Sequence, residues 1–312
     1  MTRINPGSLH PHRLPLSHHL LALAVVAVWG TNFVVIRHAL DVMPPLALAA
    51  LRFALAFLPA ALLVKRPAVP LRQLAAYGVL VGAGQFGVMF IAMKGSISPG
   101  MASLVIQTQV FFTIGLAVAI EGERVRGAQV VALLLAVAGL GLIASQSDGA
   151  SATPRGLALV LAAALAWSCA NLVGRRAGRV DMVAYMVWSS AFAVPPLIVL
   201  SLLLEGPAAI AHGLQHAGWG TWLAIVWQSV GNTLFGYAAW AWLLARHPAA
   251  TVTPWALGVP VFGMASSAVL LGEALPGWKL AAAALVIAGL TINVMAHRWA
   301  ARRAGAWRAR DR

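Results

Sequence analysis

Long apolar runs, each interrupted only by a short polar break, occupy most of the chain. A helix that crosses a bilayer needs about 20 mostly apolar residues. Lipid accepts only helices or closed barrels, and runs this long without alternation favour helices. The pattern predicts an all-α membrane protein with ten transmembrane helices, over residues 19–37, 44–64, 71–93, 99–120, 127–146, 155–174, 183–204, 220–244, 249–271 and 278–298.

Composition agrees with lipid as the main solvent. Hydrophobic residues make up 61% of the chain and charged residues 10%, with a mean hydropathy of +0.83. Soluble domains carry roughly 25% charged residues. The first apolar run continues without a small-residue cleavage site, so we expect a retained helix and not a signal peptide. The single cysteine, Cys169, excludes an intrachain disulfide and a cysteine metal site, and we expect no metal and no cofactor.

Basic residues indicate the orientation. With the N-terminus in the cytoplasm, 17 of the 22 Lys and Arg residues fall in cytoplasmic segments, 4 fall in outer breaks, and Arg52 lies within a span. This asymmetry predicts cytoplasmic N- and C-termini. The net charge of +14 would suggest nucleic acid in a soluble protein. Here the basic residues lie in short breaks without interleaved aromatics, so we expect the lipid bilayer and no nucleic acid as partner.

The chain repeats itself at an offset of 150 residues. Segment 122–142 matches 272–292 without a gap, with a Gly-Glu pair at the start of each segment and Gly139 opposite Gly289. Five helices per half is an odd number, so the second half enters the membrane inverted, as in many carriers. A duplication kept only for packing is the alternative. The predicted organisation is a cytoplasmic tail 1–18, a five-helix repeat 19–146, a linker 147–154, a second five-helix repeat 155–298, and a basic cytoplasmic tail 299–312.

Several motifs together resemble a known family. They are WGTNFVVIRHAL from Trp29, MPPLALAALRF from Met43, SPGMASLVIQTQVFFT from Ser98, and the Gly-Glu pairs before the fifth and tenth spans. Over residues 19–298 the chain resembles the EamA family of the drug/metabolite transporter superfamily. Within the family it is most similar to bacterial amino-acid exporters, among them those for aromatic amino acids and for cysteine and O-acetylserine. The resemblance implies a ten-helix inverted repeat in the bacterial inner membrane and metabolite efflux by alternating access.

Polar side chains within a span are costly and usually face the bundle interior. Asn and Gln offer donors and acceptors that suit a zwitterion, whereas aromatic and Met side chains suit its apolar part. Gln85 shares a predicted helical face with Met89, and Gln228 shares one with Asn232. Hydrogen bonding between helices is the alternative role for any single polar residue. The candidate substrate-binding residues are Asn32, Gln85, Met89, Gln107, Gln109, Asn171, Trp188, Gln228, Asn232 and Tyr237.

Arg52 is the one charged residue well within a span. It could bond to helix ends or attract a substrate carboxylate, and the family resemblance favours a structural or gating role, because arginine recurs there beside different substrates. Pro260 is a candidate hinge, since proline removes a backbone donor and can kink a helix. A static bend is the alternative for Pro260.

The remaining ionisable groups constrain the mechanism. All eight acidic residues and all nine histidines lie at breaks, tails or span ends. A proton-coupled carrier usually keeps an ionisable group in the membrane. We therefore expect facilitated diffusion or exchange. We expect Glu123 and Glu273 to cap helices or to pair with nearby arginines.

Other functional classes fit less well. The chain has no HExxH or GxSxG motif and no acid-base dyad within a span, so we expect no enzyme. Charged rings and filter loops of channels are also absent from the sequence. The sequence favours a monomeric exporter of aromatic or other neutral amino acids. Cysteine-pathway metabolites such as cysteine and O-acetylserine, or a broader set of metabolites and drugs, are the alternative substrates.

Overall fold

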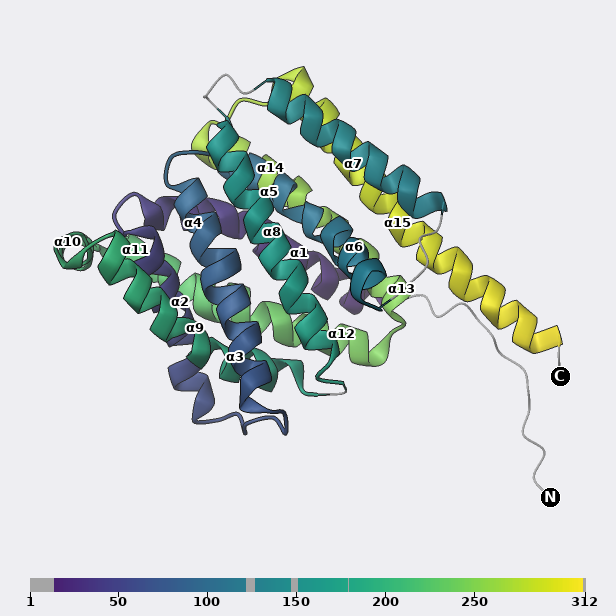
Figure 1. Cartoon of the computed structure of the whole chain (residues 1–312), viewed down its shortest axis with the longest axis horizontal. Coiled ribbons are helices and arrows are strands. Elements are labelled where there is room, and N and C mark those ends of the chain that lie inside the picture. The colour runs from purple at the N-terminus through teal and green to yellow at the C-terminus, as the bar shows by residue number, and fades with distance from the viewer. Residues whose placement is uncertain (1–13, 122–126, 147–150, 179, 311–312) are drawn as a thin grey trace.

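The computed structural model describes residues 14–121, 127–146, 151–178 and 180–310 and is an all-helical bundle (Figure 1). Short breaks with Pro, Gly, Ser or Asp set the helix ends. Ser98, Thr153 and Asp181, for example, each accept a hydrogen bond from a backbone N–H of the first turn of α5, α8 and α9. The helices of the first half are α1 (Leu16–Leu40), α2 (Pro45–Ala61), α3 (Leu71–Val79), η1 (Leu80–Gly87), α4 (Val88–Met93), α5 (Pro99–Val105), η2 (Ile106–Thr108), α6 (Gln109–Glu121) and α7 (Gly127–Ser145).

The second half has a similar order of elements. Its helices are α8 (Pro154–Arg175), α9 (Met182–Leu204), α10 (Pro207–His216), α11 (Trp219–Val226), η3 (Trp227–Phe235), α12 (Gly236–Arg246), α13 (Ala249–Val252), η4 (Thr253–Leu257), α14 (Gly258–Leu271) and α15 (Gly277–Arg310).

Eight helical stretches among the described residues are long and apolar enough to cross a membrane. The expected spans 44–64 and 220–244 are not among the eight. The first corresponds to α2, an apolar helix of 17 residues. The second corresponds to the unbroken helical stretch α11–η3–α12, which carries Gln228 and Asn232 in its middle. Both regions are therefore helical as predicted, and the chain is a multi-pass membrane protein.

Four spans change their helical hydrogen-bonding pattern along their length. The third and eighth expected spans contain π-helical segments, η1 and η3, and the fourth and ninth contain 3₁₀ segments, η2 and η4. π segments within α-helices are rare and frequently mark functional sites. The sequence pattern predicted regular α-helices in these four spans and did not indicate the change.

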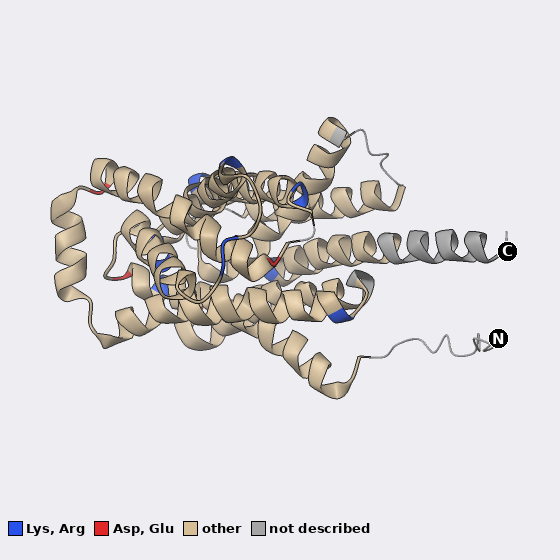
Figure 2. Ribbon diagram, turned by 90° about the horizontal axis from the view of Figure 1, so that it is seen from below, with Lys and Arg blue, Asp and Glu red and all other residues tan. Residues whose placement is uncertain are grey.

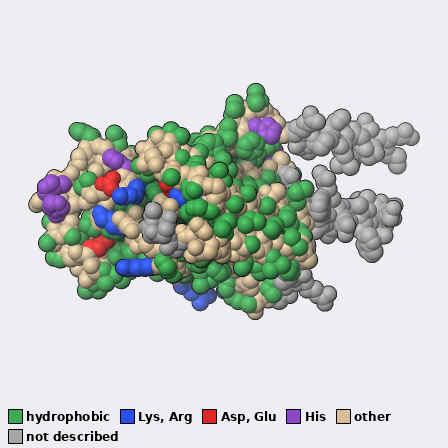
Figure 3. Space-filling view, turned by 90° about the horizontal axis from the view of Figure 1, so that it is seen from above, with side chains coloured by type: hydrophobic (Ala, Val, Ile, Leu, Met, Phe, Trp, Pro, Cys, Tyr) green, Lys and Arg blue, Asp and Glu red, His purple; other side chains and the backbone are tan. Residues whose placement is uncertain are grey.

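The surface is largely apolar, as lipid contact requires. Leu62, Leu203, Val269 and Leu270 are all more than 60% exposed. Charged side chains occupy few places on the ribbon (Figure 2). In the space-filling view hydrophobic side chains spread over the visible face, while the blue and red side chains gather toward its left part (Figure 3). A water-soluble protein rarely exposes contiguous apolar surface of this extent.

Helices α7 and α15 lie side by side along one edge of the bundle (Figure 1). Glycines allow this close approach. A Cβ atom on Gly139 would lie 2.8 Å from a methyl carbon of Val286 and 3.1 Å from the carbonyl oxygen of Ala282. A Cβ atom on Gly289 would lie 2.6 Å from the carbonyl oxygen of Ala132. The contact of Gly139 with Ala282 and that of Gly289 with Ala132 are therefore equivalent, because their residue numbers differ by 150.

Two segments differ from the expected organisation. The break after residue 204 contains α10, whose Gly213 packs against Pro44 and Met43 before α2. Helix α15 continues to Arg310, so the expected C-terminal tail 299–312 is mostly a continuation of the last helix. No Gly or Pro lies within residues 290–303, so nothing in this segment ends the helix. The expected N-terminal tail 1–18 overlaps the start of α1 by three residues and otherwise lies almost wholly outside the described residues.

Candidate functional site

Arg52 is 1% exposed and lies between spans that are distant in sequence. It belongs to α2, which begins at Pro45 directly after Pro44 and is apolar on either side of the arginine. Its Nη2 atom donates to Asn232 Oδ1 at 2.9 Å and to Thr233 Oγ1 at 3.1 Å, both in η3. The guanidinium carbon lies 3.7 Å from the centroid of the Phe86 ring in η1. Arg52 therefore joins the two π segments.

The η3 segment also holds the backbone of Arg52. Ser229 Oγ donates to the Arg52 carbonyl oxygen at 2.9 Å. Within η3, Thr233 Oγ1 donates to the carbonyl oxygen of Gln228 at 2.9 Å. The π pattern leaves backbone carbonyls without their usual i+4 partner, and hydroxyl groups here satisfy one of them. Arg52 is thus fixed through both its backbone and its side chain.

Several buried polar atoms in α2 and in elements that contact it have no hydrogen-bond partner among the described residues. They are Arg52 Nε and Nη1, Gln85 Oε1, Asn32 Oδ1, and both side-chain polar atoms of Gln228. Asn32 lies in α1, Gln85 in η1 and Gln228 in η3, and each of these elements contacts α2. Unsatisfied polar atoms cost about 1–3 kcal/mol each, and such atoms on neighbouring elements of an apolar bundle are characteristic of a polar-ligand site. We call Arg52, Asn32, Gln85, Gln228 and Asn232 the central polar cluster.

Aromatic rings border the central polar cluster. Trp29 Nε1 donates to the Asn232 carbonyl oxygen at 3.2 Å. The Trp29 ring lies 5.7 Å from that of Tyr237 and 5.2 Å from that of Trp240, centroid to centroid. Asn32 follows Trp29 by three residues, on the same side of α1. Tyr237, which is predicted to bind substrate, is therefore near Asn232.

Other predicted site residues lie elsewhere. Asn171 Nδ2 donates to Gln109 Oε1 at 3.0 Å, which joins α8 to α6. Ser168 Oγ adds a second bond to the Gln109 carbonyl oxygen at 2.8 Å. This geometry matches the alternative role of polar residues as bonds between helices. Gln107, in η2, and Met89, in α4, are both buried.

Trp188 lies toward one end of the bundle. Its Nε1 donates to the Val64 carbonyl oxygen at 3.0 Å, and its ring lies 5.7 Å from the Phe57 ring. Pro260 is buried in the first turn of α14, directly after η4. Its ring removes a backbone donor where the 3₁₀ segment gives way to the α-helix, and both the hinge and the static bend remain predictions.

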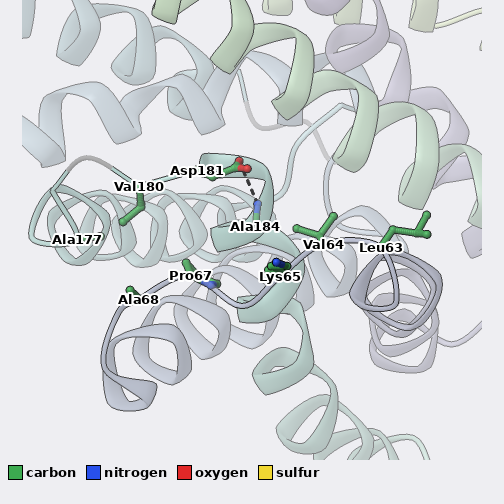
Figure 4. Close-up of a pocket in the computed structure, with 9 residues that line it drawn as sticks. All are labelled: Leu63, Val64, Lys65, Pro67, Ala68, Ala177, Val180, Asp181 and Ala184. Atoms are coloured by element: carbon green, nitrogen blue, oxygen red, sulfur yellow. Dashed lines mark hydrogen bonds between the residues drawn. The ribbon is translucent and has the colours of Figure 1, made fainter.

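A pocket of about 640 Å³ opens beside Trp188, between the loop after α2 and the loop before α9 (Figure 4). Asp181 at its rim accepts hydrogen bonds from the backbone N–H groups of Val183 and Ala184. Sequence reasoning missed this pocket, because it forms from two loops more than 100 residues apart. The residues that line it are Leu63, Val64, Lys65, Pro67, Ala68, Ala177, Val180, Asp181 and Ala184.

Glu273 joins the start of α5 to the segment between α14 and α15. Ser98 Oγ donates to its Oε1 at 2.5 Å, Gly100 N donates to its Oε2 at 3.1 Å, and Ser267 Oγ also donates to Oε2. Lys279 Nζ donates to Oε1 at 2.9 Å. Burial raises the pKa of this carboxyl, but the bonds from Ser267, Ser98 and Lys279 outweigh it, and the net pKa is lowered. Glu273 is thus a pair partner as predicted, although to a lysine and not to an arginine.

Glu123, the counterpart of Glu273 in the first half, lies outside the described residues.

Comparison with known proteins gives a consistent result. A sequence profile described as the EamA-like transporter family matches residues 16–145 and again residues 154–295. The chain is 43% identical to a probable amino-acid metabolite efflux pump of Salmonella typhimurium, over 89% of this chain and 95% of that protein. It is 41% identical to a probable amino-acid metabolite efflux pump of Escherichia coli K12, over 90% of this chain and 95% of that protein.

More distant relatives extend the picture. A probable terminal-alkyne amino-acid exporter of Streptantibioticus cattleyicolor is 28% identical, over 89% of this chain and 94% of that protein. A solved crystal structure matches with a TM-score of 0.60 and 23% identity, over 90% of this chain and 98% of that chain, and shows a likeness of fold.

Proposed function

Since the chain belongs to the EamA-like transporter family, we propose that it exports aromatic or other neutral amino acids across the bacterial inner membrane by alternating access. Family membership makes the chain a transporter and not an enzyme. The amino-acid substrate is supported by the names of its relatives, two of them amino-acid metabolite efflux pumps and one an amino-acid exporter. Export of cysteine-pathway metabolites or of a broader set of metabolites is the alternative.

The central polar cluster carries this proposal. Its unpartnered atoms include donors on Arg52 and Gln228 and acceptors on Asn32, Gln85 and Gln228. A zwitterion needs both, because its carboxylate accepts and its ammonium donates. The rings of Trp29 and Tyr237 offer contact to an apolar side chain. The pair of Gln109 and Asn171, by contrast, is assigned a structural role.

The helix contacts support ten spans in two inverted repeats. Helix α1 packs on α14 as α8 packs on α6 and η2, and α8 packs on η1 as α1 packs on η3. The pairs α7–α15 and α2–α9 each join equivalent spans of the two halves. The π segments and the 3₁₀ segments also fall in equivalent spans. This correspondence is what a pseudo-two-fold axis would produce, and it supports the proposal that the central polar cluster lies between the halves.

The proposed route runs from the pocket beside Trp188 to the central polar cluster. With both termini in the cytoplasm, Lys65 and Asp181 lie on the cytoplasmic side, where an exporter must admit its substrate. Val64 follows the end of α2, and within α2 Phe57 lies five residues, or about 7.5 Å at 1.5 Å per residue, from Arg52. Trp188 contacts both Val64 and Phe57, so it lies on this route.

Substrate gradients are the proposed energy source. The acidic residues all lie at breaks, tails or span ends. Of those described, Glu273 and Glu205 are engaged at helix ends, Glu205 by the backbone N–H groups of Leu46 and Ala47. This arrangement supports facilitated diffusion or exchange. The proposed carrier is a monomer.

A substrate panel in proteoliposomes tests the function. Liposomes preloaded with unlabelled Trp, Phe, Thr, cysteine or O-acetylserine are placed in the same labelled compound, and exchange is measured against protein-free liposomes. We expect saturable exchange of at least one neutral amino acid. Preference for cysteine and O-acetylserine would favour the alternative, and exchange of none would refute the proposal. Concentrative uptake driven by an imposed pH gradient would refute the proposed energy source.

A further inference from the structure

We propose that Arg52 binds the carboxylate of the exported amino acid, while the side-chain carbonyl oxygens of Asn32, Gln85 and Gln228 receive its ammonium group. The inference rests on the proposed function. It gives Arg52 a direct role in recognition, whereas the sequence analysis favoured a structural or gating role.

The charge of Arg52 is the first reason. A buried cation is strongly unfavourable unless an anion pairs with it. The described carboxylates are engaged elsewhere: Asp41 pairs with Arg37, Asp181 and Glu205 accept from backbone N–H groups, and Glu273 pairs with Lys279. In the sequence, Glu121, Glu123, Asp148 and Asp311 fall at span ends, breaks or tails. A carboxylate carried in by the substrate supplies the missing charge.

The donors of Arg52 are the second reason. Nη2 is occupied by Asn232 and Thr233, and the Phe86 ring packs on the guanidinium. These contacts fix the position of the group and leave Nε and Nη1 without a partner among the described residues. A fixed guanidinium with free N–H groups is well suited to bind a carboxylate, because little side-chain entropy remains to be lost.

Two other cations of the protein, the buried Lys279 and the exposed Lys94, show what a structural role looks like. Lys279 donates to the Glu273 carboxylate and to the Ala274 carbonyl oxygen, and Lys94 donates to the Leu40 carbonyl oxygen. Both ammonium groups therefore bond to helix ends or to a carboxylate. Arg52 uses only one of its three nitrogens, and for two neutral side chains. Arg52 therefore differs from Lys279 and Lys94 in having N–H donors without a partner among the described residues, and a ligand could accept from these donors.

The acceptors complete the site. Asn32 Oδ1, Gln85 Oε1 and Gln228 Oε1 have no partner among the described residues. They come from α1, η1 and η3, three elements that each contact α2, the helix of Arg52. An ammonium group has three N–H donors and no acceptor, so three carbonyl oxygens match it. The proposed site thus separates a carboxylate end at Arg52 from an ammonium end at the amides.

Head-group analogues test this assignment in the unaltered protein. The amino acid that exchanges best in the panel serves as the labelled parent compound. Its carboxamide and its N-acetyl derivative are each added as competitors, and the inhibition of parent exchange in proteoliposomes is measured. The carboxamide keeps the ammonium, and the N-acetyl compound keeps the carboxylate. We expect the carboxamide to bind at least about 10-fold more weakly than the parent, since hydrogen bonds to charged groups contribute about that factor or more. Equal competition by carboxamide and parent would overturn the inference.

Variants then locate the recognition. In Arg52→Gln the ratio of parent to carboxamide affinity should fall to near one, while the ratio of parent to N-acetyl affinity stays unchanged. A residue that only supports the fold would lower both affinities alike. Arg52→Lys keeps the charge, so it should retain part of the carboxylate preference and serves if Arg52→Gln does not fold. Arg37→Gln, in a surface pair with Asp41, is the matched control and should leave both ratios unchanged.

The outcomes separate the two proposals. Exchange of no amino acid by the unaltered protein refutes the proposed function and this inference with it. Exchange of an amino acid with an unchanged carboxamide ratio in Arg52→Gln, or in Arg52→Lys if only that variant folds, refutes the inference alone.

Discussion

Glu273→Gln tests whether a buried ion pair at one end of the bundle stabilises the fold. The Lys279 side chain is 2% exposed and the Glu273 side chain 10%. The substitution removes the negative charge and leaves Lys279 buried with only the Ala274 carbonyl oxygen as partner. Removing one member of a buried pair typically costs about 3–5 kcal/mol. Because glutamine keeps one acceptor for Ser98 or Ser267, we expect about 3 kcal/mol.

The assay is unfolding in detergent–lipid micelles by added SDS, followed by tryptophan fluorescence. The matched control is Asp41→Asn, which breaks the exposed pair with Arg37, at 2.6 Å with side chains 35% and 56% exposed. Exposed pairs contribute about 0–1 kcal/mol. If Glu273→Gln lowers the free energy of unfolding by no more than Asp41→Asn, the stabilising role assigned to the buried pair is wrong.

The same carboxyl predicts a pH dependence of stability. Its pKa is lowered in the folded protein, so its contribution is complete above the unfolded pKa of about 4.3 and is lost as the pH falls through the folded pKa. The free energy of unfolding of the unaltered protein should therefore fall below about pH 4 more steeply than that of Glu273→Gln. Parallel curves for the two proteins would contradict the assigned hydrogen bonds.

Three further substitutions test contacts within the bundle. Gly139→Leu and Gly289→Leu should each lower the free energy of unfolding in SDS by about 1–3 kcal/mol, because a side chain there meets the facing helix of the α7–α15 pair. Gly141→Leu is the control, since a Cβ atom at Gly141 has no neighbour within 4 Å. Trp188→Phe should lower the free energy of unfolding by about 0.5–1.5 kcal/mol, because the hydrogen bond to the Val64 carbonyl oxygen is lost. The ratio of the affinity for the parent amino acid to the affinity for its carboxamide should stay unchanged. An altered ratio in the exchange assay would place Trp188 at the central polar cluster.

Much of the fold was predictable, because lipid imposes a simple rule on sequence. All ten expected spans coincide with helices, and eight of them are long and apolar enough to cross a membrane. The π and 3₁₀ segments were not predictable. In η3 the widened turn depends on Thr233 and Ser229, which bond to Gln228 and Arg52, and such tertiary contacts leave no periodic signal in the sequence.

The candidate site was predictable in its residue types but not in its grouping. Intramembrane amides are rare enough to identify Asn32, Gln85, Gln228 and Asn232 from sequence. Arg52 contacts Asn232, which lies 180 residues away in the chain, and one sequence cannot reveal such a contact. Phe86 was missed altogether, because a phenylalanine in an apolar span carries no signal of its own. The pairing of Gln109 with Asn171 was equally hidden, and it changes the role proposed for both residues.

Counterflow is the most direct test of the central claim, that this transporter moves amino acids by alternating access. Proteoliposomes are preloaded with millimolar unlabelled amino acid and diluted into a trace of the same labelled compound. A carrier should accumulate label transiently above the outside concentration, because each inward step of label is coupled to outward movement of unlabelled substrate. Simple equilibration without an overshoot, or an initial rate independent of internal substrate, would contradict the account.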